Sequence, residues 1–291
     1  MHNNALAHYP PIALAHLKNW WSQNSRTHHP LAIKYVASCE STNSQLYRSP
    51  SHATTLLVTD IQTQGRGQFE REWQTRTGDL IFSLGVRLHS SKIQALSIRV
   101  GLALAQVCAQ FGFSAQLKWP NDVILQSGKL AGILVQSNPS SQTDMNWVVI
   151  GVGVNIAARA DLSPDLSPAK KSTSAFTPIG LSQVDAQWLN PTEGQREALI
   201  MHIVDEILLH IDGERTLSSE YLSTEWNQRD IWRNQPIVWT DPFGQKHHGT
   251  GLGIDPDGTY QMRSSRGNVA IYSGQIRAAD ANDSTHSNAD T

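Results

Sequence analysis

Two spacings of hydrophobic side chains recur from Lys34 onward, and together they predict alternating strands and helices. Between Leu96 and Phe111 the apolar residues repeat every three or four positions, which is the pattern of an amphipathic helix. Shorter segments rich in aliphatic and β-branched residues are typical of strands. These segments are Thr55–Asp60, Leu80–Leu88, Val123–Gln126, Leu130–Gln136 and Trp147–Ile156. The two patterns indicate an α/β or α+β fold.

Helices are also expected on either side of this region. Pro11–Gln23 carries its apolar residues on one face, and another helix is expected after Asn190-Pro191, where proline suits a first turn. A further helix is expected at about Leu217–Gln228. Ala157–Gln183 is rich in Ser, Pro and Ala without periodicity, and a loop of this length is usually functional or disordered.

After Arg233 the chain changes to short strands separated by turns that contain proline and glycine. The predicted strands are Pro236–Thr240, Gly249–Ile254, Thr259–Arg263 and Asn268–Tyr272. The predicted domains are an N-terminal extension (1–30), a large catalytic domain (31–232), a small β domain (233–279) and a disordered tail (280–291).

Composition excludes several classes of protein. A net charge of −2 gives no overall attraction to nucleic acid. The two cysteines, Cys39 and Cys108, are too few for a disulfide framework or a cysteine-rich zinc site. No apolar run approaches the ~20 residues that cross a bilayer. The amino terminus lacks the charged and apolar regions of a signal peptide, so we expect a cytoplasmic enzyme.

The first candidate for chemistry is the loop Gly65-Arg66-Gly67. Glycine lets the main chain approach an anion closely, and the guanidinium of Arg66 adds a planar cation. A Gly-Arg-Gly sequence by itself is more often a solvated surface loop. Arg71 and Trp73 follow in the same polar segment, and Trp73 fits either an indole that contacts a nucleotide or a core aromatic residue.

Two further motifs place lysines beside turns. Lys118-Trp119-Pro120-Asn121-Asp122 ends in a carboxylate that fits either a Mg²⁺ ligand or a turn residue. Lys129 follows a hairpin turn predicted at Ser127-Gly128, and Gly132 leaves room for a ligand. Preorganised positive charge stabilises a transferring phosphate. The candidates for that charge are Arg66, Arg71 and Lys129.

A group of short polar side chains occurs earlier in the chain. Ser41-Thr42-Asn43 is expected to open a helix, either as an N-cap or as part of a binding site. Later, Gly151 and Gly153 weaken their predicted strand unless a ligand or another backbone comes close. The Gly-x-Gly pattern lacks the further glycine and the acidic residue of a dinucleotide fold.

In this order, the segments between Ser41 and Asn155 resemble those of the biotin protein ligases, which attach biotin to a lysine of an acceptor protein. The resemblance implies a mixed, largely antiparallel sheet like that of class II aminoacyl-tRNA synthetases, followed by a small SH3-like β-barrel. It also implies that ATP and Mg²⁺ activate biotin as biotinyl-5′-AMP. The implied acceptor is the biotin carboxyl carrier protein of acetyl-CoA carboxylase, and a homodimer is compatible with the sequence.

The resemblance also implies roles for individual residues. Arg66 and Lys129 would be catalytic, and Asp122 would bind Mg²⁺. Biotin would contact Ser41, Thr42, Asn43, Gln62, Gly65, Arg66, Gly67, Lys129 and Gly132. The nucleotide would contact Arg66, Arg71, Trp73, Lys118, Asn121, Lys129 and Asn155.

The loop departs from the family pattern, which usually reads Gly-Arg-Gly-Arg-x-Gly-Arg-x-Trp. This chain has Gln68 and Glu70 where arginine and glycine are common. Gln68 removes one positive charge, and Glu70 replaces a flexible position with a negative one. We therefore expect no role for a second arginine at this point of the loop.

Two other functions remain open from the sequence. A lipoate or octanoyl transferase of related fold is disfavoured by the spacing from Gly65 to Trp73 and by the Lys118–Asp122 motif. A regulator that senses biotinyl-AMP would need a recognition helix, and Pro11–Gln23 supplies one short helix only. We therefore expect neither nucleic acid nor membrane as a partner.

Overall fold

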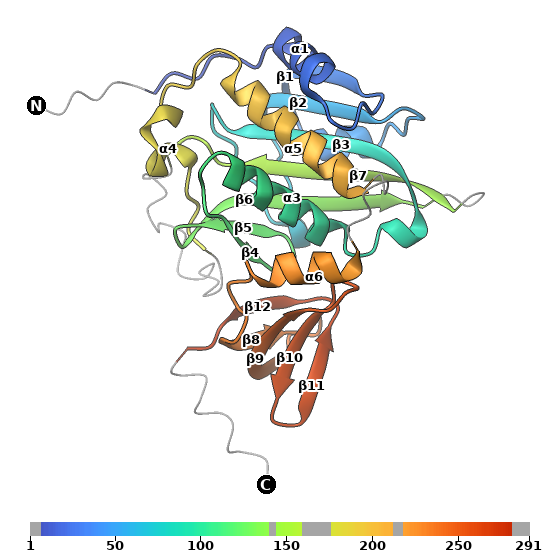
Figure 1. Cartoon of the computed structure of the whole chain (residues 1–291), viewed down its shortest axis with the longest axis vertical. Helices are drawn as coiled ribbons and strands as arrows, with labels where there is room; N and C mark the ends of the chain where they lie inside the picture. Colours follow the sequence, from blue (N-terminus) through green and yellow to red (C-terminus); the bar gives the residue numbers. More distant parts are fainter. Residues whose placement is uncertain (1–6, 140–143, 159–175, 212–217, 281–291) are drawn as a thin grey trace, which may run out of the picture.

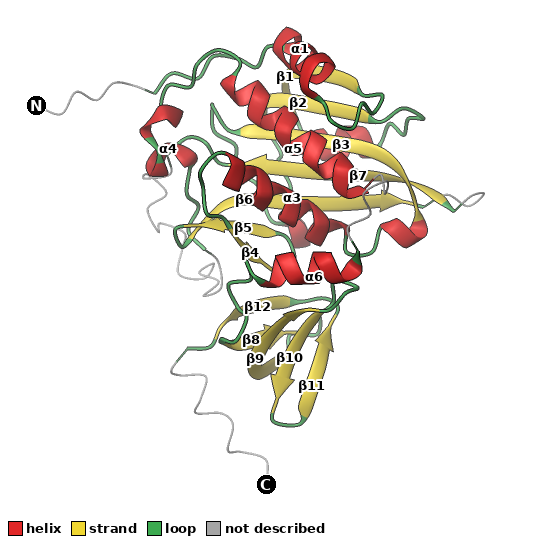
Figure 2. Ribbon diagram, in the orientation of Figure 1, coloured by secondary structure: helices red, strands yellow, loops and turns green. Residues whose placement is uncertain are grey.

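The computed structural model describes residues 7–139, 144–158, 176–211 and 218–280. Within these residues, seven strands form a mixed sheet with the order β1-β2-β3-β7-β6-β5-β4 (Figures 1 and 2). The strands are β1 (Ala32–Cys39), β2 (Thr55–Gln62), β3 (Leu80–His89), β4 (Gln116–Lys118), β5 (Asp122–Leu125), β6 (Gly128–Asn138) and β7 (Met145–Val154). β1 and β2 are parallel and the other neighbours are antiparallel, as the resemblance implied.

The long helices gather on one face of this sheet, where α3 and α5 cross in front of the strands in Figure 1 and α1 packs on α5. The α-helices are α1 (Leu14–Asn24), α2 (Thr42–Tyr47), α3 (Leu96–Gln110), α4 (Leu181–Val184), α5 (Gln195–Ile211) and α6 (Ser219–Asn227). Short 3₁₀ turns occur at Gln68–Glu70, Ser90–Lys92 and Ala186–Trp188. The predicted helices are confirmed, with ends shifted by a few residues.

The two faces of the sheet differ because side chains alternate along a strand. On β2, Leu56 and Val58 belong to the large core under α3 and α5, whereas Leu57 packs with Leu46 of α2 and Trp147 of β7 in a separate cluster. The helix α2 therefore covers the opposite face. Because α2 is only six residues long, it leaves much of that face uncovered.

The C-terminal β domain has five described strands in the order β11-β10-β9-β8-β12, and every pair is antiparallel. They are β8 (Pro236–Thr240), β9 (Lys246–Ile254), β10 (Tyr260–Ser264), β11 (Gly267–Ile271) and β12 (Gln275–Ala278). Four of them confirm the predicted strands, and β12 was missed. In Figure 1 this domain lies below the sheet, with α6 between the two.

The hairpin between β5 and β6 corrects one prediction. Its two turn residues are Gln126 and Ser127, with φ of 46° and 64°, and Leu125 pairs with Gly128. The turn was therefore predicted one residue too late. Gly128 is needed for packing instead, because a Cβ there would lie 2.7 Å from the side chain of Ile179.

Some predictions fall on residues outside the described ranges. Most of the segment Ala157–Gln183 lies there, because the structure describes it only up to residue 158 and again from residue 176. The predicted tail, residues 280–291, is described only at Asp280.

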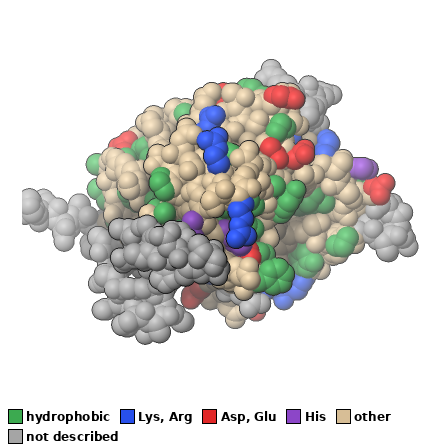
Figure 3. All heavy atoms as spheres, turned by 90° about the horizontal axis from the view of Figure 1, so that it is seen from below, with side chains coloured by type: hydrophobic (Ala, Val, Ile, Leu, Met, Phe, Trp, Pro, Cys, Tyr) green, Lys and Arg blue, Asp and Glu red, His purple; other side chains and the backbone are tan. Residues whose placement is uncertain are grey.

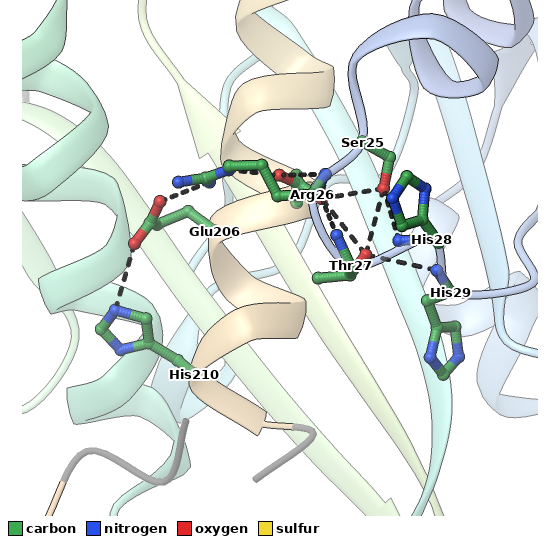
Figure 4. A network of polar contacts seen from close by, with 8 residues as sticks. Ser25, Arg26, Thr27, His28, His29, Glu206 and His210 are labelled. Carbon is green, nitrogen blue, oxygen red and sulfur yellow. Dashed lines mark hydrogen bonds and ion pairs between the residues drawn. The ribbon is translucent and has the colours of Figure 1, made fainter. Parts of the chain in front are cut away.

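The segment before β1 packs on α5 through a buried carboxylate. Asp205 of α5 is fully buried and accepts hydrogen bonds from the Ser25 hydroxyl at 2.9 Å and from Nε of Arg26 at 2.7 Å. The backbone and hydroxyl of Thr27 donate to the same carboxylate. Figure 4 shows these residues turned toward α5, with Arg26 reaching on to Glu206. A carboxylate buried in this way needs all its partners, so Asp205 fixes the residues that lead into β1.

We predict that Asp205→Ala lowers the free energy of unfolding by roughly 3 kcal/mol, because several donors of the 25–27 turn lose their acceptor. Urea denaturation measures the change, and trypsin should cleave the variant after Arg26 sooner than the wild type. The control is Glu40→Ala, which removes a pair with Arg48 whose side chains are 61% and 64% exposed. That change should cost under about 1 kcal/mol. Equal stability of the two variants would contradict the role of Asp205.

Candidate active site

A cleft opens on the sheet face that α2 leaves uncovered, and small residues form its floor. Ser83 of β3, Gly132 of β6, and Gly151 and Gly153 of β7 all line it. Their neighbours, such as Phe82 and Val152, point into the opposite core. The sequence analysis expected a ligand or another backbone close to the two β7 glycines, whereas the structure places side chains there, Asn43 at Gly151 and Trp73 at Gly153. A Cβ at Gly151 would lie 2.7 Å from Oδ1 of Asn43.

One end of the cleft carries a network of neutral polar groups. The backbone N–H of Thr42 donates to Oε1 of Gln62 at 2.8 Å, and the Thr42 hydroxyl lies 2.8 Å from that of Ser83. The Ser83 hydroxyl donates to Oδ1 of Asn43 at 3.2 Å, and Nδ2 of Asn43 donates to Gln136 at 2.6 Å. Ser41 caps α2 at its first turn. Rigid hydrogen-bonding groups of this kind can recognise a ring that has both donors and acceptors.

Ser83 and Gln136 were missed by the sequence analysis. Ser83 is fully buried in a strand whose other residues are mostly apolar. A polar residue at such a position could have indicated a site residue from the sequence. Gln136 carried no comparable signal, because β6 is only half-buried at that point.

The other end of the cleft is ionic. The Asp122 carboxylate accepts from Nζ of Lys129 at 2.6 Å and from Nζ of Lys118 at 3.2 Å. Burial opposes ionisation of Asp122, but the ammonium groups of Lys129 and Lys118 outweigh it and hold the pKa of Asp122 below its ordinary value. The carboxylate therefore stays charged at neutral pH and keeps both lysines directed into the cleft.

The backbone around this ionic end is held from several sides. Lys129 forms a parallel bridge with Pro178, and its N–H donates to the carbonyl of Thr177 at 2.9 Å. Nδ2 of Asn155 donates to the carbonyl of Lys129 at 2.9 Å. Asn121 holds β6 by two hydrogen bonds. Its Nδ2 donates to the carbonyl of Ile133, and the N–H of Ile133 donates to the carbonyl of Asn121. These contacts fix the position from which the Lys129 side chain extends.

The Gly65–Trp73 loop folds back on itself beside the cleft. The N–H of Trp73 donates to the carbonyl of Gly65 at 2.9 Å, and the backbones of Arg66 and Glu72 form an antiparallel β-bridge. A Cβ on Gly65 would lie 2.3 Å from the Trp73 carbonyl oxygen, so this closure requires glycine. Arg66 and Arg71 are both exposed where they line the cleft, free of the tight packing that surrounds Lys129.

The indole of Trp73 lies over the glycine floor. A Cβ on Gly132 or Gly153 would lie 2.7 Å or 2.4 Å from the ring, and Nζ of Lys129 lies 5.5 Å from the ring centroid. Among the described residues, no acceptor meets the buried indole N–H. The ring therefore occupies space that a ligand on this floor would need, and its own polar group gains nothing from being there.

The C-terminal β domain also reaches the cleft, through Gly274, Gln275 and Ile276. Phe176, just after the undescribed part of the long loop, lines it as well. Neither contribution was predicted, because the sequence places both far from the motifs. The cleft is thus shared between the two parts of the chain that Figure 1 shows above and below α6.

The structure brings most of the predicted site residues into this one cleft. Those that line it are Ser41, Thr42, Asn43, Gln62, Arg66, Gly67, Arg71, Trp73, Lys118, Asn121, Asp122, Lys129 and Gly132. Gly65 and Asn155 do not line it. Gly65 accepts a hydrogen bond from the N–H of Trp73, and the Asn155 side chain donates to the carbonyl of Lys129.

A metal site is not built by these residues alone. Within the described part of the chain, no group of three or more His, Cys, Asp or Glu side chains could hold an ion. Both oxygens of Asp122 are already bonded to lysines. Its role as a Mg²⁺ ligand stays a prediction, and it requires that a lysine give up one oxygen.

Comparison with known proteins agrees with this geometry. Residues 35–155 match the model of the biotin/lipoate A/B protein ligase family. The biotin–[acetyl-CoA-carboxylase] ligase of Mycobacterium tuberculosis is 28% identical over 257 residues, covering 84% of this chain and 88% of that protein. The bifunctional ligase/repressor BirA of Bacillus spizizenii is 26% identical, covering 83% of this chain and 71% of that protein.

The fold is shared with solved structures. The biotin protein ligase from Aquifex aeolicus, in complex with biotin and ATP, superposes with a TM-score of 0.65 at 21% identity, covering 85% of this chain and 99% of that one. The cleft, the order of its motifs and the match of sequence and fold lead to the same conclusion. The chain is similar to the biotin protein ligases in sequence and shares their fold.

Proposed function

We propose that this protein is an ATP-dependent ligase that activates biotin as biotinyl-5′-AMP and transfers it to a lysine of the biotin carboxyl carrier protein of acetyl-CoA carboxylase. One observation carries the proposal. A neutral hydrogen-bonding end around Thr42 and Ser83 and an ionic end around Lys129 share one glycine floor. Such a cleft suits an acid with a polar ring at one end and a carboxylate that must meet a phosphate at the other.

The polar end favours biotin over lipoate, the runner-up substrate. Biotin's ureido ring has two N–H donors and a carbonyl acceptor, whereas the dithiolane ring of lipoate has neither. Thr42, Asn43 and Gln62 could exchange hydrogen bonds with the ureido ring but would gain none from an apolar ring, so their polarity favours biotin. The names of the relatives in M. tuberculosis and Paracoccus denitrificans point the same way.

The first step joins biotin to the nucleotide. A carboxylate oxygen of biotin attacks the α-phosphorus of ATP, and pyrophosphate leaves with the electron pair of the broken P–O bond. Lys129 and Lys118 would stabilise the negative charge that gathers on the phosphate oxygens, and Arg66 and Arg71 would close over it from the rim. Trp73 would move off the floor glycines to admit the ligand and would then pack against it.

In the second step, the amine of the acceptor lysine attacks the acyl carbon and AMP leaves. The developing charge again falls near Lys129. Mg²⁺ would enter with ATP, bound mainly by phosphate oxygens, and Asp122 is the carboxylate best placed to contribute. As Lys129 turns from Asp122 toward phosphate, it would free one carboxylate oxygen.

Partners and location follow from the same proposal. In the described residues no helix has the length and hydropathy to span a bilayer, and ATP as substrate favours the cytoplasm. Figure 3 shows one face of the molecule, seen from below the view of Figure 1, on which the visible Lys and Arg side chains are scattered rather than gathered in one block. A homodimer is compatible with the proposal.

We predict that ATP–pyrophosphate exchange by this protein depends on biotin and does not occur with lipoate. Labelled biotin should then appear on the carboxyl carrier protein only when both ATP and Mg²⁺ are present. Exchange that is faster with lipoate, or transfer of biotin without ATP, would overturn the proposed function.

We predict that Lys129→Ala lowers the rate of exchange at least ~100-fold, because a preorganised charge at the phosphate is removed. Circular dichroism should show an intact fold, since Lys129 is 27% exposed. Lys34→Ala, an exposed lysine on β1 far along the sheet order from β6, serves as the control and should exchange at the wild-type rate. Wild-type exchange by Lys129→Ala would contradict the assignment of the ionic end.

We predict that biotin with ATP changes the intrinsic fluorescence of the protein, because the Trp73 indole leaves its place over Gly132 and Gly153. Trp73→Phe should lose most of that change. Trp20→Phe, in the helix layer on the other face of the sheet, should keep it, since Trp20 of α1 packs against His202 of α5 and does not line the cleft. A full signal from Trp73→Phe would mean that the indole does not move.

A further inference from the structure

The boundary between the catalytic sheet and the C-terminal β domain passes directly behind the ionic end of the cleft. The strand β4 ends at Lys118, and Leu117 forms a parallel bridge with Asp230, which follows α6. The N–H of Leu117 donates to the carbonyl of Arg229 at 2.8 Å, and the N–H of Ile231 donates to the carbonyl of Leu117 at 3.1 Å. The segment 229–231 therefore extends the edge of the sheet beside the first lysine of the site.

Asp230 connects this segment to the β domain. The residue is 9% exposed, and its carboxylate accepts from the hydroxyl of Tyr260 at 2.8 Å and from the N–H of Trp232 at 3.0 Å. Burial raises the pKa of Asp230 to about 6, while these two hydrogen bonds oppose the rise. At neutral pH the group is a buried carboxylate that depends on both donors.

Tyr260 connects the same carboxylate to the Lys118–Asp122 motif. Its ring is fully buried, with its centroid 6.0 Å from that of Trp119 and 6.5 Å from that of Trp226. The indole N–H of Trp119 donates to the carbonyl of Gly258, in the turn that leads to β10. Trp119 is the residue next to Lys118, so the β domain contacts the motif from behind the cleft.

We propose that Asp230 and Tyr260 are positioning residues, through which the C-terminal β domain holds Leu117 and Trp119 and so sets where Lys118 and Asp122 stand in the cleft. The inference rests on the proposed function and adds to it a role for a domain that supplies few groups to the cleft. Tyr260 and Asp230 do not line the cleft themselves. Their effect is transmitted by two contacts on either side of Lys118, and a catalytic cation displaced by a fraction of an ångström loses much of its effect.

The alternative is that this network only stabilises the domain boundary. The two roles predict different kinetics. A structural role lowers the melting temperature and leaves the kcat of the folded protein unchanged. A positioning role lowers kcat or raises the KM for ATP while the KM for biotin stays the same, because Thr42 and Ser83 lie on α2 and β3, at the polar end of the cleft.

The decisive variant is Tyr260→Phe, which removes one oxygen and leaves the ring. We expect its kcat/KM for ATP in pyrophosphate exchange, per folded molecule, to fall about 10-fold, with the KM for biotin within about 2-fold of wild type. Asp230→Asn keeps the shape, accepts from Trp232 and can donate to the Tyr260 oxygen, so it should retain most activity. Asp230→Ala should resemble Tyr260→Phe.

The matched control is Tyr221→Phe, which removes a partly exposed hydroxyl on α6 that accepts only from Gln106 among the described residues. It should exchange at the wild-type rate. An unchanged kcat/KM for ATP in Tyr260→Phe, or an equal rise in both KM values, would overturn the positioning role. Should Asp230→Ala fail to fold, Tyr260→Phe alone decides the question.

Amide hydrogen exchange separates this inference from the proposed function. In Tyr260→Phe the amides of residues 117–122 should exchange faster than in wild type, whatever acid the enzyme uses. If wild-type protein shows no exchange of pyrophosphate with biotin, the proposed function fails and this measurement still stands. If the amides of 117–122 are equally protected in both proteins, the positioning inference fails and the proposed function is untouched.

Discussion

The cleft depends on a difference between the two faces of one sheet. On β3 and β7, bulky residues such as Phe82 and Val152 fill the core under α3 and α5. The positions between them hold Ser83, Gly151 and Gly153, so the part of the other face beneath the cleft has few large side chains. Side chains alternate across a strand, and this one pattern therefore builds a closed core and an open floor at once. Any larger residue at Gly153 would collide with Trp73.

Buried carboxylates hold the edges of this arrangement. Asp122 keeps two lysines in the cleft, Asp205 fixes the residues before β1, and Asp230 links the sheet to the C-terminal β domain. A buried carboxylate is costly unless several donors meet it. Asp205 and Asp230 therefore draw donors from segments far along the chain, whereas Asp122 holds two lysines from nearby in the sequence. Because a buried charge without its donors would be unfavourable, each carboxylate keeps the loops and domains that supply those donors in place.

Sequence periodicity predicted the central elements well and the edges poorly. The strands β2, β3, β5, β6 and β7 have long apolar runs and were found within a few residues. β4 spans only Gln116–Lys118 and exists because β5 and the segment 229–231 pair with its two sides. The turn before β6 was predicted at its glycine, yet Gly128 is there to accommodate Ile179. The pairing of β4 and the packing of Gly128 both depend on residues far along the chain, so local sequence patterns could not reveal them.

The sequence by itself revealed the cationic motifs, the glycines of the floor and the polar first turn of α2. It also revealed that a small β domain follows the catalytic domain. Each of these is a local pattern of residue types. Only the tertiary structure decided that Ser83 and Gln136 join the polar end, that Asn155 supports Lys129 from outside the cleft, and that residues 274–276 form part of the wall. These are contacts between residues far apart in the chain. They are set by how strands and domains pack, and no spacing along the sequence encodes that packing.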